Sequence, residues 1–133
     1  MAQPVERCKL ILLVDPHQLT CELLQMLLEE WGYWTLVARD EQTGVTLFNL
    51  YRSEISAVLL DTTVPTEAQI AFLQTLRREK PGLKCFLISG QLVAEEMAAL
   101  KGDLLAGHIQ KPFAIGVLAQ HLEEVLGPAL PAA

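Results

Sequence analysis

The chain has 133 residues, of which 51% are hydrophobic and 20% charged, and its formal net charge at pH 7 is −6. This length is that of one domain and leaves no room for a second, and the apolar content excludes disorder over most of the chain. The acidic balance lacks the basic patch that binds nucleic-acid phosphates, so we expect protein partners and no nucleic acid.

Two further observations limit the location and the chemistry. No apolar stretch reaches about 18 residues, and residues 1–7 lack the charged-then-apolar order of a secretory signal, so we expect no membrane partner and a cytoplasmic location.

The cysteines Cys8, Cys21 and Cys85 show no CxxC spacing. This pattern predicts buried, reduced thiols and neither a disulfide framework nor a zinc site.

Short apolar runs alternate with helical patterns along the chain. The runs predict strands at Lys9–Val14, Tyr33–Ala38, Ile55–Leu60, Lys84–Ile88 and Gly107–Gln110. The intervening segments predict helices at Leu19–Trp31, Asp40–Tyr51, Glu67–Glu79, Gln91–Lys101 and Ala114–Leu126. Asp40 is the expected N-cap of the second helix, and leucines at helical spacing, among them Leu19 and Leu23, form the expected apolar face of the first.

Strands that alternate with helices indicate a parallel sheet with right-handed crossovers. We expect an α/β fold of the flavodoxin-like (βα)5 type, a three-layer sandwich whose five parallel strands lie in the order 2-1-3-4-5. The folded domain is expected at residues 9–126. Residues 1–8 are interpreted as an N-terminal extension and residues 127–133, rich in proline and alanine, as a flexible tail.

A polar residue stands at or shortly beyond the end of four of the predicted strands. These residues are Asp15, Asp61, Ser89 and Lys111. The carboxyl ends of parallel strands meet at one edge of the sheet, where open α/β sheets place their ligand sites. The sequence therefore predicts that these four side chains lie together in a functional site.

The residues around these positions carry a resemblance to a known family. The segments are Leu12–Asp15, Val58–Pro65, Leu87–Gly90 and Gln110–Phe113. In this order, on a matching alternation of strands and helices, they resemble the receiver domain of two-component response regulators over residues 9–126. The resemblance implies a signalling domain in a phosphorelay and not an enzyme.

The resemblance also assigns roles in phosphoryl transfer. Asp61 is expected to be the phosphoacceptor, which takes a phosphoryl group from a sensor histidine kinase or a phosphotransfer protein. Lys111 and Ser89 are expected to bind the phosphoryl oxygens, and Ser89 and His108 to act as switch residues. The switch would change a protein-binding surface for a downstream protein target, and a homodimer is a further partner that the resemblance allows.

A magnesium site is implied in the same place. The resemblance gives Mg²⁺ three ligands, the carboxylates of Asp15 and Asp61 and the backbone carbonyl of Thr63. Receivers normally carry a second acid after the first strand, and here Pro16 stands in its place. We therefore expect weak Mg²⁺ binding, because one carboxylate ligand is missing. The resemblance further implies a cis peptide between Lys111 and Pro112.

Three departures from the family pattern support an alternative function. They are Pro16, the segment Thr66–Gln69 in place of a glycine-containing turn, and His108 where an aromatic switch residue is usual. In the alternative, the chain is a pseudo-receiver that acts as a phosphorylation-independent protein-interaction module. Phosphorylation by acetyl phosphate with Mg²⁺ distinguishes the two functions.

Other interpretations of single residues stay open at this point. Asp15 is also a candidate N-cap, with Pro16 at the first helical position, and Ser89 is a candidate cap of the fourth helix. Leu60–Thr63 faintly resembles the nucleophile segment of haloacid-dehalogenase-type phosphatases, but Thr63 stands where their second acid is expected. An FMN site is disfavoured, because the segment after the first strand lacks a Ser-, Thr- or Gly-rich phosphate loop.

Overall fold

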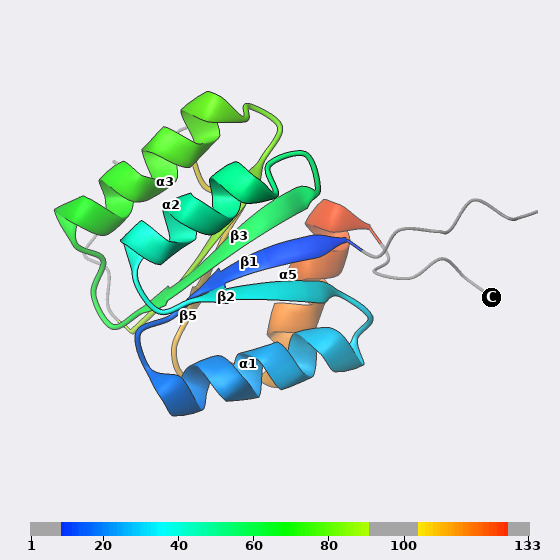
Figure 1. Cartoon of the computed structure of the whole chain (residues 1–133). Helices are drawn as coiled ribbons and strands as arrows, with labels where there is room; N and C mark the ends of the chain where they lie inside the picture. The colour runs from blue at the N-terminus through cyan, green and yellow to red at the C-terminus, as the bar shows by residue number, and fades with distance from the viewer. Residues whose placement is uncertain (1–8, 91–103, 128–133) are drawn as a thin grey trace, which may run out of the picture.

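The structure, a computed structural model, describes residues 9–90 and 104–127. Strands and helices alternate along these residues (Figure 1). In chain order they are β1 (Leu10–Val14), α1 (Gln18–Glu30), β2 (Trp34–Ala38), α2 (Glu41–Leu50), β3 (Ile55–Thr62), α3 (Glu67–Glu79), β4 (Lys84–Ser89), β5 (Gly107–Gln110) and α5 (Ile115–Leu126). The helix predicted at Gln91–Lys101 lies outside the described residues, as do the extension at residues 1–8 and most of the predicted tail.

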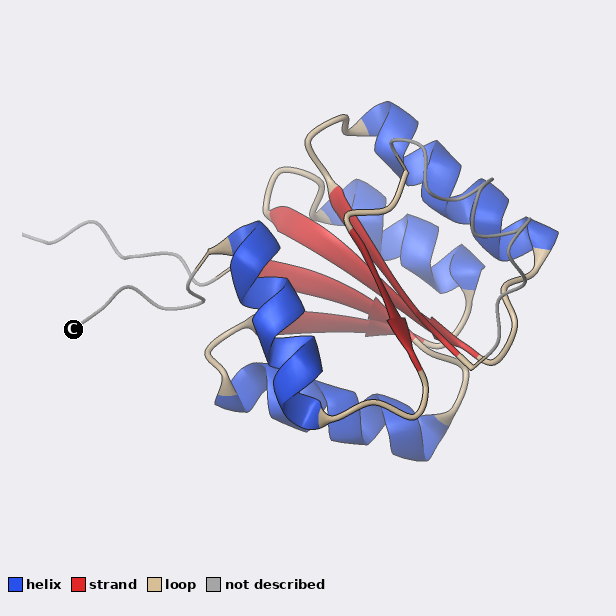
Figure 2. Ribbon diagram, turned by 180° about the vertical axis from the view of Figure 1, so that it is seen from behind, coloured by secondary structure: helices blue, strands red, loops and turns tan. Residues whose placement is uncertain are grey.

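The five strands form one parallel sheet in the order β2-β1-β3-β4-β5, which confirms the predicted flavodoxin-like topology. Helices α1 and α5 cover one face of the sheet, and α2 and α3 cover the other (Figures 1 and 2). The described elements therefore form three layers, with the sheet in the middle.

The sheet is buried on both faces, which explains the unbroken apolar runs in the sequence. Successive side chains of a strand point to opposite faces. Ile11 and Leu13 of β1 thus pack with α1 and α5, while Leu12 and Val14 pack with α2 and α3. None of these four side chains exposes more than 2% of its surface.

Two central strands are longer than predicted. The parallel register pairs Asp61 with Ile88 and Thr62 with Ser89. β3 therefore continues through Asp61 to Thr62, and β4 continues to Ser89. Backbone pairing persists where the apolar run has ended, since it depends on main-chain groups and not on side-chain polarity. The polar residues therefore belong to the sheet itself.

Side-chain caps fix the starts of two helices. Asp40 Oδ1 accepts the backbone N–H of Thr43 at 2.7 Å, which confirms its predicted capping role in α2. At α3, Thr66 Oγ1 accepts the N–H of Gln69 at 3.0 Å and Gln69 Oε1 accepts the N–H of Thr66 at 3.0 Å. This reciprocal pair is a capping box. The segment Thr66–Gln69 thus starts a helix in place of a glycine-containing turn.

Gly44 of α2 permits close packing of α2 against α3. A Cβ added there lies 2.9 Å from Phe72 Cζ, whereas a Cβ at Gly116 of α5 meets nothing within 4 Å. We predict that Gly44→Ala lowers the free energy of unfolding by about 1–2 kcal/mol through overpacking. Gly116→Ala is the matched control and should raise it by about 0.5–1 kcal/mol. Urea denaturation of both variants checks this, and equal effects would contradict the packing argument.

Candidate functional site

The carboxyl edge of the sheet brings the predicted polar residues together. Asp15 follows β1, Asp61 lies near the end of β3, Ser89 ends β4 and Lys111 follows β5. Asp15, Asp61 and Ser89 are fully buried. Buried polar groups are costly unless they are paired, so their concentration at one edge marks a functional site.

Asp61 is ion-paired with Lys111, whose side chain is 28% exposed. The pair joins Lys111 Nζ to Asp61 Oδ1, and Asp61 Oδ2 has no hydrogen-bond partner among the described residues. Burial raises the pKa of Asp61 to about 6, with the Lys111 ammonium acting to lower it and the Asp15 carboxylate to raise it. The result is a poorly solvated carboxylate with one oxygen free to react.

Asp15 faces the same edge from a fixed loop. Its Oδ1 accepts the backbone N–H of His17 at 2.8 Å, and its Oδ2 has no partner among the described residues. Arg39 donates to the carbonyl oxygens of Asp15 and Pro16, at 3.1 and 2.9 Å. These bonds hold the loop between β1 and α1.

The alternative that Asp15 caps the first helix is wrong. α1 begins at Gln18 with His17 at the N-cap, and no side chain caps it. Pro16 therefore precedes the helix and does not occupy its first position. The bond from Asp15 Oδ1 to the N–H two residues on is a local turn, of the kind that Asp commonly forms.

The oxygen atoms at this edge suit a hard divalent cation. Asp15 Oδ2 and Asp61 Oδ2 are buried carboxylate oxygens without donors in the described part of the chain. The Thr63 carbonyl accepts the Gly90 N–H at 2.9 Å and keeps a second lone pair. Mg²⁺ favours such oxygen ligands and fills its remaining positions with water. Among the described residues, no group of three or more His, Cys, Asp or Glu side chains is placed to hold a metal ion, so the site offers a cation two carboxylates.

Ser89 makes a hydrogen bond that the sequence pattern did not predict. Its Oγ lies 2.8 Å from Nε2 of His108, a residue of the neighbouring strand β5. Burial lowers the pKa of His108, which favours the neutral form of its imidazole. The backbone carbonyl of Ser89 accepts the N–H of Lys111 at 2.8 Å, and the Lys111–Pro112 bond is cis, as predicted. Capping of the fourth helix by Ser89 lies outside the described residues.

An apolar groove adjoins the polar edge between α1 and the segment that follows β5. Its cavity volume is about 560 Å³, and its lining includes Leu23, Phe113 and Ile115 beside Lys111. Leu23 is 50% and Ile115 51% exposed. The leucine spacing places Leu24 and Leu28 on the apolar face of the first helix, and both are buried there with Cys21. Leu19 and Leu23, expected on the same face, are exposed.

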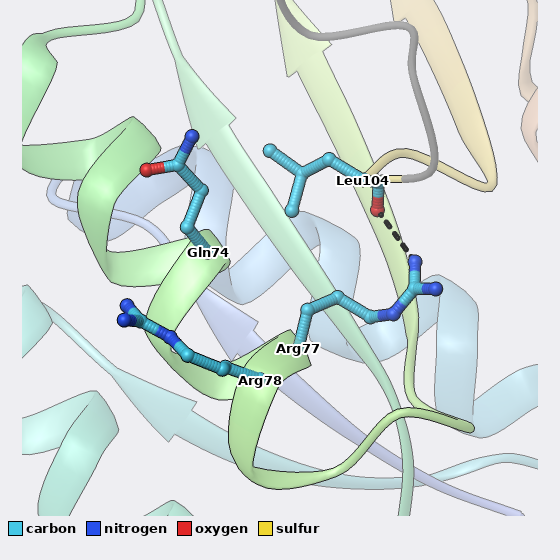
Figure 3. Close-up of a pocket in the computed structure, with 4 residues that line it drawn as sticks. All are labelled: Gln74, Arg77, Arg78 and Leu104. Carbon is cyan, nitrogen blue, oxygen red and sulfur yellow. Dashed lines mark hydrogen bonds between the residues drawn. The ribbon is translucent and has the colours of Figure 1, made fainter.

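A second pocket, of about 470 Å³, lies at the opposite end of the sheet and is separate from this site. It is lined by Gln74, Arg77 and Arg78 of α3 together with Leu104. Arg77 extends toward Leu104 and donates to its carbonyl oxygen at 3.3 Å (Figure 3). Because α3 leads into the start of β4, these residues lie near the amino ends of the strands.

Comparisons with known proteins agree with this geometry. Residues 11–123 match the family model described as the response regulator receiver domain. Over 119 residues the chain is 28% identical to the probable transcriptional regulatory protein TcrX of Mycobacterium tuberculosis, a match that covers 87% of this chain and 49% of that protein. The chain thus spans about half the length of this curated relative.

Solved structures show the same fold. A CheY-like response regulator receiver domain protein from Methanospirillum hungatei has a TM-score of 0.80 at 21% identity, covering 92% of this chain and 97% of that one. The signal receiver domain of an HD domain-containing protein from Pseudomonas fluorescens has a TM-score of 0.78 at 24% identity, covering 92% of this chain and 98% of that one.

Among the described helices of this chain, none is long and apolar enough to cross a membrane.

The raised pKa of Asp61 predicts a pH-dependent cost to stability. The folded-state value of about 6 exceeds the unfolded value of about 3.9, so the proton on Asp61 favours folding. Its contribution is fully present below pH 4 and is lost as the pH rises through 6. Asp61→Asn removes the charge, so we expect it to be more stable than the wild type by about 1–3 kcal/mol at pH 7.5.

This difference should shrink to about 0.5 kcal/mol at pH 4 and disappear by about pH 3, where the Asp61 carboxyl is neutral in both the folded and the unfolded state. Urea denaturation of the two proteins across this pH range, with EDTA present, measures it. Asp40→Asn is the control, because the exposed Asp40 side chain caps α2 and takes no part in the ion pair, and its pKa is lowered by the hydrogen bonds from Thr43. A difference between wild type and Asp61→Asn that does not change with pH would show that Asp61 is not desolvated.

Proposed function

Because the chain belongs to the response regulator receiver domain family, we propose that it accepts a phosphoryl group on Asp61 and converts this change into altered protein binding. The observation that carries the proposal is the fully buried Asp61 carboxylate, paired with Lys111 and left with one oxygen that has no partner among the described residues. An ionised carboxylate has several lone pairs, so an oxygen without a hydrogen-bond donor keeps one to attack phosphorus even when another binds a cation.

The transfer step follows from these groups. An Asp61 oxygen attacks the phosphorus of a phosphohistidine, the O–P bond forms, and the N–P bond breaks with its electron pair returning to the imidazole of the donor. Lys111 stays beside Asp61 and stabilises the negative charge on the phosphoryl oxygens. Mg²⁺ bound to Asp15, Asp61 and the Thr63 carbonyl would neutralise further charge on this group. Ser89 then binds a phosphoryl oxygen.

The phosphodonor is a protein in this proposal, either a sensor histidine kinase or a phosphotransfer protein of the cytoplasm. The apolar groove supports this, because it is lined in part by Lys111, the partner of Asp61, and exposes about half of Leu23 and Ile115. Exposed apolar surface of this kind marks protein contacts. A downstream protein target would read the phosphorylated state.

A second candidate function is the pseudo-receiver, which binds proteins without phosphorylation. Pro16 favours it, because this residue brings no carboxylate to the site and its carbonyl is bonded to Arg39. The intact pair of Asp61 and Lys111 favours the phosphorylated receiver. The buried, charged Asp61 carboxylate lowers the stability of the fold. A module that never binds a phosphoryl group has no function that requires this loss of stability.

Reaction with acetyl phosphate tests the proposed function. Incubation of the chain with acetyl phosphate and Mg²⁺ should add one phosphoryl group, detected by intact-mass spectrometry at neutral pH. Borohydride reduction and peptide mapping should place it on Asp61, and Asp61→Asn should lose it. Asp40→Asn is the matched control and should keep it, because this exposed carboxylate only caps α2. A group on a histidine or serine, or none on the wild type, would refute the assignment.

The missing acid at position 16 makes a separate prediction. Pro16→Asp should bind Mg²⁺ about tenfold more tightly than the wild type and react faster with acetyl phosphate, because a carboxylate is added beside Asp15. Pro16→Asn is the control, since it removes proline to the same extent without adding charge. Calorimetric Mg²⁺ titration of the three proteins measures the affinity. Equal affinities for Pro16→Asp and Pro16→Asn would show that the absent carboxylate does not limit the site.

A further inference from the structure

The hydrogen bond between Ser89 and His108 crosses two neighbouring strands. Ser89 is the last residue of β4, and the register of β4 with β5 pairs Leu87 with His108 and Ser89 with Gln110. His108 thus lies diagonally across from Ser89, with its Nε2 2.8 Å from the hydroxyl oxygen. Ser89 is fully buried, so the imidazole replaces water as the partner of this hydroxyl.

A serine hydroxyl has one proton and two lone pairs, so the bond has two forms. In the first, Ser89 donates its proton to a bare Nε2, and the neutral imidazole carries its hydrogen on Nδ1. In the second, Nε2–H donates to Ser89 Oγ, and the hydroxyl proton stays free. Only the second form leaves Ser89 able to donate to an oxygen of a phosphoryl group.

The electrostatics of the carboxyl edge favour the second form. Asp61 Oδ2 and Asp15 Oδ2 are buried acceptors with no donor among the described residues, and they lie at the same edge as Ser89. Negative charge in a buried site orients a nearby hydroxyl with its hydrogen toward the charge. The lone pairs of Ser89 Oγ are then left for His108, which must supply a donor.

We propose that His108 is a positioning residue, whose Nε2–H donates to Ser89 Oγ and directs the hydroxyl proton toward the phosphoryl group on Asp61. This deepens the proposed function and rests on it. The neutral imidazole then has its bare Nδ1 on the other side of the ring, and the side chain as a whole is half-buried. A hydrocarbon side chain at position 108 offers Ser89 no donor.

The first arm of the test does not depend on phosphorylation. Long-range ¹H–¹⁵N NMR of histidine-labelled protein at pH 8 distinguishes the tautomers of a neutral imidazole. The spectrum of His108→Gln identifies the His108 signals by their loss. We expect hydrogen on Nε2, and hydrogen on Nδ1 would overturn the proposal.

The second arm compares three variants in the reaction with acetyl phosphate. Ser89→Ala and His108→Phe should each slow phosphorylation of Asp61, or destabilise its product, about tenfold, as expected for a lost hydrogen bond to a charged group. His108→Gln keeps an N–H donor and should stay within about twofold of the wild type. Circular dichroism confirms that each variant is folded.

A double-mutant cycle separates positioning from packing. In the Ser89→Ala background, His108→Phe should have no further effect, because its partner hydroxyl is gone. Additive losses, or equal losses for His108→Phe and His108→Gln, would overturn the proposal. If the wild type takes no phosphoryl group, the proposed function fails, and the tautomer of His108 alone then decides the donor assignment.

Discussion

The burial of the Asp61 carboxylate beside a single ammonium group is the constraint on which the site depends. Strand neighbours lie about 4.8 Å apart, so β3 and β5 are separated by about 10 Å with β4 between them. The Lys111 side chain must therefore cross the end of β4 to reach Asp61. Ser89, at the end of β4, lies on the path.

This arrangement costs stability. Burial raises the pKa of Asp61 to about 6, which means that the folded state holds the charged carboxylate less well than water does. An ion pair that serves only stability would avoid this cost. Proteins retain a destabilising buried carboxylate where function requires it. The apolar layers on both faces of the sheet, centred on residues such as Leu12 and Leu13, supply the stability that offsets it.

Much of the fold followed from local patterns. The unbroken apolar run of β1 predicted a strand buried on both faces, and four polar residues at strand ends predicted one shared edge. The start of α3 at Glu67 also agrees with the sequence pattern, but the capping box, a Thr followed three residues later by Gln, is seen there only as a departure from a glycine-containing turn. Glycine was expected there by analogy, and the side-chain cap supplies an equally good start for α3.

Other features needed the three-dimensional register. The bond between Ser89 and His108 depends on how β4 aligns with β5, and periodicity does not fix that alignment. The exposure of Leu23 depends on which face of α1 packs on the sheet, because the helix carries leucines on more than one face and only Cys21, Leu24 and Leu28 are buried. Pro16 illustrates the same limit, since the start of α1 lies two residues later than a first-turn proline requires.

The most direct test is the titration of the Asp61 carboxyl carbon by ¹³C NMR in metal-free buffer. The signal is identified by its loss in Asp61→Asn. The account predicts an apparent pKa of about 6 in the wild type and a higher pKa in Lys111→Met, because the ammonium lowers it. A pKa of Asp61 near 4, as in an exposed aspartate, that is the same in the wild type and in Lys111→Met would contradict this interpretation.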